Sequence, residues 1–176
     1  HKFGAPKGIG VLYIRRGVVL ERLIHGAGHE VGRRAGTESA LLIAAIGKAA
    51  EIAAALSSVK SIRTLRDFFW EGLRLNFGDR VLLNGDPIAR LPNTLNVSFL
   101  DNQGATVLQY LDGIAASTGS ACHTGQMEPS PVLTAMGIDR NRALSAVRFS
   151  LGYFTTKDEI EVVLRKLKQS ISSETE

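Results

Sequence analysis

The one cysteine of the chain, Cys122, lies in a run of small and polar residues, Ser117-Thr118-Gly119-Ser120-Ala121-Cys122-His123-Thr124-Gly125. Thiols usually pack inside proteins as small hydrophobic groups. A thiol without bulky apolar neighbours instead favours a nucleophile in a loop that can move. An ordinary half-buried cysteine is the alternative that composition leaves open. The adjacent His123 would favour the reactive thiolate if its imidazolium faced the sulfur.

A second candidate nucleophile, Lys2, precedes a loop with three glycines and a proline between Phe3 and Gly10. A lysine that forms a Schiff base must lose its proton, which requires burial or a neighbouring positive charge. The residues alone show neither condition. A metal site built on His25 and His29 would need further ligands that the sequence does not identify, so no metal site is predicted.

The composition is that of an ordinary soluble globular protein, with 176 residues, 44% hydrophobic residues and a net charge of +4. The basic pairs Arg15-Arg16 and Arg33-Arg34 lack interleaved aromatic residues, so we expect no nucleic-acid partner. Residues 40–56 are nearly all apolar, but Lys48 and Glu51 interrupt them. We therefore expect a core helix there and no membrane segment.

The single cysteine excludes an internal disulfide framework and a zinc site made of several thiolates. A reducing compartment is compatible with this, and we expect a cytoplasmic protein. The chain starts at His1 without Met or a signal-like segment. We therefore expect a fragment or a processed chain.

The residue pattern predicts helices and strands along the whole chain. Thr37 is predicted to cap a long helix from about Glu38 to Leu56, and Thr156 and Glu159 form a capping-box pattern before the last helix. The other predicted helices cover residues 58–77, 103–111 and 129–136. The predicted strands cover residues 11–14, 18–24, 81–83, 94–99, 114–116 and 146–150.

The pattern divides the chain into three parts. Residues 1–36 resemble the edge of a larger α/β domain, because their two predicted strands have no partners. Residues 37–57 form a connecting long helix. Residues 58–176 interleave strands with helices, which predicts a small α+β domain.

Several blocks in a fixed order resemble one enzyme family. Residues 1–13, HKFGAPKGIGVLY, resemble the lysine segment of the cysteine desulfurases and selenocysteine lyases, which are class V aminotransferase-like, pyridoxal-phosphate-dependent enzymes of fold type I. Arg34-Ala35-Gly36-Thr37 resembles their Arg-x-Gly-Thr loop, and residues 91–99 resemble their small-domain strand. Residues 117–122 resemble their catalytic-cysteine loop, and residues 147–152 resemble their substrate-arginine strand.

The resemblance implies an α/β parent protein of fold type I, of which this chain is the C-terminal part. Lys2 would bind pyridoxal 5'-phosphate covalently and shuttle protons, and His1 would approach the cofactor phosphate. Thr37 would contact the phosphate in a neighbouring subunit, which implies a homodimer. Arg148 would bind the substrate carboxylate; without the resemblance it would be a surface charge. Cys122 would take sulfur as a persulfide.

The implied reaction converts L-cysteine to L-alanine and passes sulfur to an acceptor protein, such as an iron–sulfur scaffold. Selenocysteine lyase, acting on L-selenocysteine, is the close alternative. A third possibility, of another class, is a non-catalytic fragment that serves as a dimerisation or interaction module. The cofactor contacts that the family draws from its N-terminal half are not in this sequence, so the isolated chain is expected to be inactive. Tyr153 stands where the family often has arginine.

Overall fold

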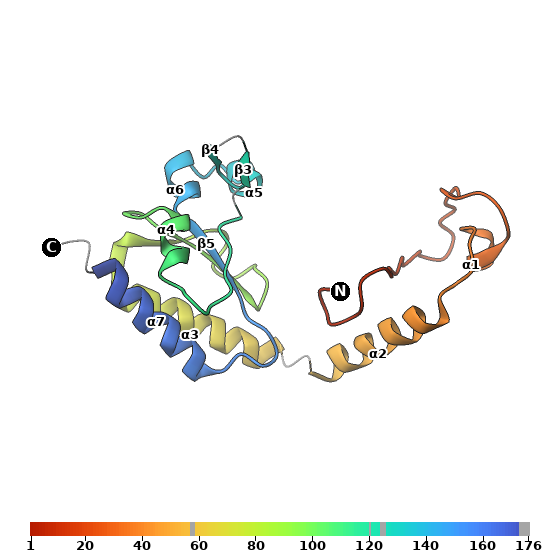
Figure 1. Ribbon diagram of the computed structural model, residues 1–176, viewed down its shortest axis with the longest axis horizontal. Helices are drawn as coiled ribbons and strands as arrows, with labels where there is room; N and C mark the ends of the chain where they lie inside the picture. Colours follow the sequence, from red (N-terminus) through yellow and green to blue (C-terminus); the bar gives the residue numbers. More distant parts are fainter. Residues whose placement is uncertain (57–58, 120, 124–125, 173–176) are drawn as a thin grey trace. The chain divides into compact units, whose positions relative to one another are not determined.

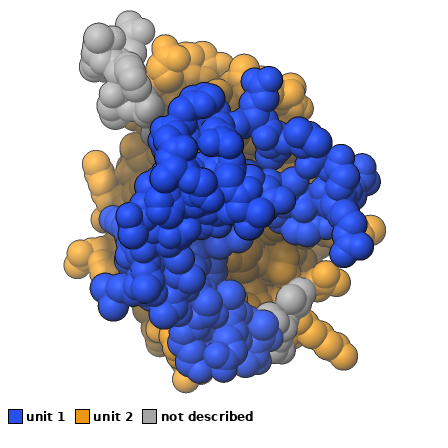
Figure 2. Space-filling view, turned by 90° about the vertical axis from the view of Figure 1, so that its right-hand side faces the viewer, with its two compact units in different colours: residues 1–57 blue, residues 58–176 orange. Residues whose placement is uncertain are grey.

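A computed structural model of the chain describes residues 1–56, 59–119, 121–123 and 126–172. At residues 56, 59, 121–123, 126 and 172 it describes the backbone only. The chain divides into two compact units, residues 1–57 and residues 58–176 (Figure 2).

The first unit consists of α2 (Ala40–Leu56), the short α1 (His29–Gly32) and long connecting loops (Figure 1). The strands predicted over residues 11–14 and 18–24 are not present, and these residues lie in loops and turns. A strand is stable only when a neighbouring strand pairs with its backbone groups. The described part of this unit offers no such neighbour, so the prediction was wrong.

The start of α2 also differs from the prediction. Ser39 caps the helix, because its hydroxyl accepts a hydrogen bond from the backbone N–H of Leu42 at 3.4 Å. The Ser39 carbonyl accepts the first helical bond, from Ile43, at 2.9 Å. Serine satisfies the free amides of a first turn at least as well as threonine. The predicted cap, Thr37, is therefore wrong, and its exposed side chain lies two residues before the capping residue.

The second unit is built on a three-stranded antiparallel sheet. Its strands are β1 (Val81–Leu83), β2 (Thr94–Phe99) and β5 (Ala146–Ser150), in the order β1-β2-β5. The register places Leu95 opposite Phe149. Two long helices, α3 (Val59–Phe77) and α7 (Lys157–Ser172), pack against each other, and α4 (Gly104–Gln109) follows β2 (Figure 1).

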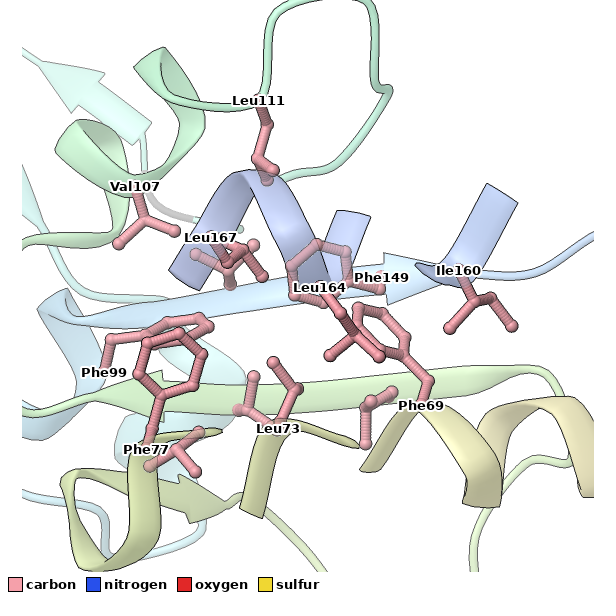
Figure 3. Packing of buried hydrophobic residues seen from close by; sticks show 14 of the residues in the cluster. Phe69, Leu73, Phe77, Phe99, Val107, Leu111, Phe149, Ile160, Leu164 and Leu167 are labelled. Carbon is pink, nitrogen blue, oxygen red and sulfur yellow. The ribbon is translucent and has the colours of Figure 1, made fainter. Parts of the chain in front are cut away.

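One hydrophobic core joins these elements. Phe69, Leu73 and Phe77 recur every four residues on α3, so they share one face of the helix and are all buried. Figure 3 shows that face packed against side chains of β5 and α7. The ring of Phe69 meets that of Phe149 edge-on at 4.9 Å, and Phe77 meets Phe99 at 5.7 Å. The alternating apolar residues of the strands complete the core.

Most predicted elements of this unit are confirmed. β1, β2 and β5 have the predicted bounds, and α3 and α7 lie within a residue or so of theirs. The capping box is formed as predicted: the Thr156 N–H donates to the Glu159 carboxylate at 2.8 Å. The Glu159 N–H donates back to the Thr156 hydroxyl at 3.2 Å. This exchange satisfies two amides of the first turn of α7.

Three features of this unit differ from the sequence-based prediction. Residues 114–116 form no strand. A two-stranded hairpin, β3 (Ala121–His123) and β4 (Gln126–Glu128), replaces the expected loop. After α5 (Pro131–Ala135), a further helix, α6 (Arg140–Leu144), begins behind Asp139, whose carboxylate accepts the Arg142 N–H at 3.0 Å.

Two arginines hold the segment that leads into β2. The buried Arg66 donates to the Asp67 carboxylate at 2.6 and 2.9 Å and to the Leu91 carbonyl at 2.7 Å. Arg90 approaches the same carboxylate at 3.5 Å. Burial, together with the nearby Arg66 charge, lowers the pKa of Arg90. The pair thus fixes the backbone at the beginning of the block that resembles the family's small-domain strand.

Among the described residues, no single helix is long and apolar enough to cross a membrane.

Candidate active site

Lys2 lies in a tight turn at the start of the first unit. The Gly4 N–H donates to the His1 carbonyl at 3.2 Å, and Gly4 has a φ of +93°, which favours glycine. Ala5 follows and packs against Ile46 on α2 in a small apolar cluster. The Lys2 side chain is exposed and has no hydrogen bond or ion pair with another described residue. The turn is therefore anchored from one side, and the amine faces solvent.

Thr37 is at the other end of the same unit. Ala5 packs on Ile46 and Ala49. At 1.5 Å per helical residue, these lie about 9 to 14 Å along the axis from the first residue of α2. Thr37 precedes that first residue, at the end of α2 opposite the labelled N-terminus (Figure 1). The structure therefore does not place the Thr37 hydroxyl beside the anchor of the Lys2 turn.

The glycine-rich loop before Thr37 has a strained backbone. Glu30 and Val31, inside the short α1, have φ values of 52° and 56°, in the left-handed region that residues other than glycine rarely adopt. The Glu38 carboxylate accepts the Glu30 N–H at 3.3 Å. Hydrogen bonds from the backbone amides of Glu38 itself and of Glu30 lower the pKa of the Glu38 carboxyl. Arg34 donates to the Gly36 carbonyl at 2.7 Å.

The cysteine run and the predicted substrate arginine meet in the second unit. Ser117, at the start of the run, forms an antiparallel bridge with Arg148 on β5. The Arg148 N–H donates to the Ser117 carbonyl at 2.7 Å, and the Ser117 N–H donates back at 3.2 Å. Gly119 then turns the chain with a φ of +66°. The sheet thus supplies a fixed origin for the run that carries Cys122.

Cys122 lies in the middle of β3, with its Cα opposite that of Met127 on β4. The side chains of Cys122 and His123 lie outside the described residues, as do Ser120, Thr124 and Gly125. The effect that the sequence suggested for His123 on the thiol is therefore a prediction still to be tested. The backbone shows that Cys122 belongs to a paired hairpin and not to an extended loop.

Arg148 presents its side chain to solvent between the buried Val147 and Phe149. Buried and exposed side chains alternate in this way on an antiparallel strand that has one packed face. Its guanidinium has no hydrogen bond or ion pair with another described residue. An exposed guanidinium next to the cysteine run can bind a planar carboxylate with two parallel hydrogen bonds.

A buried polar network supports this region, and sequence analysis missed it. Arg142 donates to the Asn84 side chain at 3.0 Å and to the Leu83 carbonyl at 2.8 Å. Asn84 in turn donates to the Ser98 hydroxyl at 2.9 Å. The two partners of Arg142 are almost sixty residues away in sequence, so no local pattern could reveal the network. Asp139, a good capping residue, was the one local signal for α6.

The sequence profile of the family described as aminotransferase class-V matches residues 1–163. The chain belongs to the class V aminotransferase family. It is 43% identical over 175 residues to the cysteine desulfurase IscS of Pectobacterium carotovorum, and the aligned region covers 97% of this chain and 43% of that protein. The cysteine desulfurase IscS of Dictyoglomus turgidum is 41% identical, over 97% of this chain and 44% of that protein.

Solved structures agree with the sequence relatives. A NifS-like protein matches with a TM-score of 0.79 and 36% identity, over 98% of this chain and 44% of its own. A NifS-like protein from Rickettsia africae matches with a TM-score of 0.72 and 27% identity, over 88% and 41%. The chain therefore spans less than half the length of the relatives it matches. These findings confirm the predicted family and fold class.

The family depends on pyridoxal phosphate, and the side chains described here fit that cofactor. Lys2 offers a primary amine that can bond to the aldehyde of the cofactor, although the described residues of this unit do not bury it. The Thr37 hydroxyl is not used in capping α2, and both it and His1 are exposed. A hydroxyl and an imidazole are suitable hydrogen-bond donors for a phosphate. Among the described residues, no group of three or more His, Cys, Asp or Glu side chains could hold a metal ion.

Proposed function

We propose that this chain is the part of a pyridoxal-phosphate-dependent cysteine desulfurase that carries the cofactor lysine, the substrate arginine and the sulfur-accepting cysteine. The enzyme would convert L-cysteine to L-alanine and leave a persulfide on Cys122. The names of the relatives favour sulfur over selenium as the atom removed. Selenocysteine lyase is accordingly the weaker alternative.

The bridge between Ser117 and Arg148 carries this proposal. The bridge connects two backbone segments. One carries Arg148, whose side chain is suited to bind a carboxylate, and the other begins the run that contains the chain's only cysteine. A substrate with its carboxylate on Arg148 would therefore lie beside the segment that bears the nucleophile. Positioning of this kind supplies much of the rate enhancement of enzymes.

The residues would divide the work as follows. Pyridoxal phosphate, when bound, supplies the electron withdrawal that weakens bonds at the substrate α-carbon. Lys2 would hold the cofactor and move the proton at that carbon. The Cys122 sulfur would form a bond to the substrate sulfur while the carbon–sulfur bond breaks. The electron pair of that bond stays with the carbon, which takes up a proton to give L-alanine.

Thr37 would act across a dimer. Within its own unit, Thr37 is separated from the anchor of the Lys2 turn by about half the length of α2. A phosphate contact from Thr37 to the cofactor of a second subunit is compatible with that separation. The homodimer is therefore part of the proposal. The proposal also includes an acceptor protein that removes the sulfur from Cys122, and a cytoplasmic location.

The test is a pair of substitutions in the complete enzyme carrying its cofactor. Cys122→Ser is expected to keep the visible absorbance of the bound cofactor and to lose alanine formation from L-cysteine by more than about a hundredfold. Arg148→Lys is expected mainly to raise KM, because it removes a bidentate contact to the carboxylate. Full-rate desulfuration by Cys122→Ser would disprove the assignment of the nucleophile. Turnover of L-selenocysteine, measured in parallel, separates the desulfurase from the lyase.

A further inference from the structure

The strand opposite Cys122 is held by an arginine that the sequence did not single out. The Arg140 guanidinium donates to the Met127 carbonyl through Nη2 at 3.1 Å. Met127 is the residue whose Cα pairs with that of Cys122 in the β3–β4 hairpin. The hydrogen bond thus reaches the hairpin at the level of the cysteine, and not at its ends.

Arg140 can act as a fixed point because its helix is fixed. Arg140 begins α6, and two residues later Arg142 is bonded to Asn84 and to the Leu83 carbonyl at the end of β1. Ala143 of α6 is buried in a small cluster with Leu133 of α5. A short helix held by buried contacts on two sides has little freedom to shift.

The hairpin itself is small. Two strands of three residues do not form a stable hairpin in water without further support. Ser117 supports its N-terminal approach through the bridge to β5, and Arg140 supports its second strand. Figure 1 shows β4 beside α6, from which Arg140 donates to it.

We propose that Arg140 is a positioning residue for the sulfur-accepting step: by holding the Met127 carbonyl, it sets the backbone position from which the Cys122 thiol meets the substrate. This inference rests on the proposed function, because it gives Cys122 the role of nucleophile. Arg140 itself touches neither substrate nor cofactor in this assignment. The part of the reaction it should affect is the chemical step, and not the binding of the substrate carboxylate by Arg148.

The test compares Arg140→Met and Arg140→Lys in the complete enzyme. Methionine keeps an aliphatic side chain and removes the donor, whereas lysine keeps a donor that can reach a carbonyl. Because a displacement of about 1 Å can cost on the order of a hundredfold in rate, Arg140→Met is expected to lower kcat for alanine formation by about tenfold. KM should stay within about twofold, and Arg140→Lys should regain most of the rate.

Two further measurements separate positioning from general structural damage. Arg165→Ala, at an exposed arginine of α7, serves as the matched control and should leave kcat unchanged. Hydrogen exchange of the amides of residues 121–123 and 126–128 should become faster in Arg140→Met, while exchange in β2 and β5 stays the same.

An unchanged kcat in Arg140→Met, a raised KM with kcat unchanged, or loss of cofactor and of the folded state would each overturn the inference. If the complete enzyme does not desulfurate cysteine, or if Cys122→Ser keeps its rate, the proposed function fails instead. In that case the exchange measurement still decides whether Arg140 holds the hairpin: unchanged exchange refutes it, and faster exchange supports it.

Discussion

The two units differ in where they place their large apolar side chains. In residues 1–57, Val19 and Leu23 are 92% and 93% exposed. In residues 58–176, Leu73 and Leu95 are fully buried. A single chain thus contains one unit with a large closed core and one unit that buries only a small cluster and leaves most of its large apolar side chains exposed.

The helices show the reason for this difference. Along α3, apolar residues gather on one face, so a single sheet can cover them. Along α2, apolar residues occur all around, with Lys48 and Glu51 among the few charged ones, so covering one face leaves the others exposed. Large exposed apolar surfaces mark places where proteins meet a partner. The second unit therefore contains the groups that stabilise it, whereas the first leaves most of its large apolar side chains exposed.

The largest expected effect contrasts a leucine from each unit. Leu73→Ala removes a fully buried side chain and should lower the free energy of unfolding of the second unit by about 2–5 kcal/mol. Leu23→Ala removes an exposed side chain of the first unit and should change the free energy of unfolding by less than about 0.5 kcal/mol. Urea unfolding followed by circular dichroism measures both. Equal losses would show that the first unit has a core of its own.

Glycine-to-alanine substitutions sharpen the same comparison. A Cβ at Gly104 would lie 2.5 Å from the Ala146 carbonyl oxygen, so Gly104→Ala should destabilise the second unit by about 1–3 kcal/mol. At Gly47, in the middle of α2, nothing lies within 4 Å of such a Cβ. Gly47→Ala should therefore stabilise α2 by about 0.5–1 kcal/mol. Thermal unfolding of the two variants should shift in opposite directions; a shift in the same direction would contradict the contrast.

The helix caps give a smaller effect. Thr156→Ala breaks the capping box of α7 and should cost about 1 kcal/mol. Ser39→Ala should lower the helicity of α2, because Ser39 is its cap. Thr37→Ala is the matched control and should leave that helicity unchanged, as measured by circular dichroism. Loss of helicity in Thr37→Ala, with none in Ser39→Ala, would restore the cap expected from the sequence.

Two exposed carboxylates should give the smallest effect, at acid pH. The backbone amides of Ala89 and Ile88 lower the pKa of Asp86 in the second unit, as the loop amides lower that of Glu38 in the first. A lowered pKa stabilises the folded loops above the ordinary carboxylate value of about 4, and this is lost as pH falls through the lowered value. Carboxyl NMR titration should show both groups below their ordinary values. A normal value for Asp86 would exclude its two hydrogen bonds in solution.

Local patterns were sufficient where an element's stability is mostly its own. The four-residue spacing on α3 and the capping box of α7 both lie within one helix, and both predictions were confirmed. The strands β2 and β5 were also predicted with their observed bounds, because each strand has a buried face within the chain. The resemblance of Lys2, Thr37, Cys122 and Arg148 to a family's motifs likewise needed only short segments.

Predictions failed where stability depends on distant groups. The run Val11–Ile14 has the residues of a strand, but a strand forms only with a neighbour to pair with. Residues 121–123 lack strand-forming character, yet they pair with β4, to which Arg140 of α6 donates a hydrogen bond. Residues 11–14 have the pattern of a strand but no partner strand among the described residues. Residues 121–123 have a partner strand but not the pattern.

The sequence by itself determined the family, the order of the functional segments and most helices and strands of the second unit. Only the tertiary structure decided that Ser117 bridges to Arg148, that Ser39 and not Thr37 caps α2, and that Arg140 reaches the strand opposite Cys122. The physical reason is the distance along the sequence over which each interaction acts. Helix periodicity and capping act within about four residues, whereas these hydrogen bonds depend on where the folded backbone brings separate groups together.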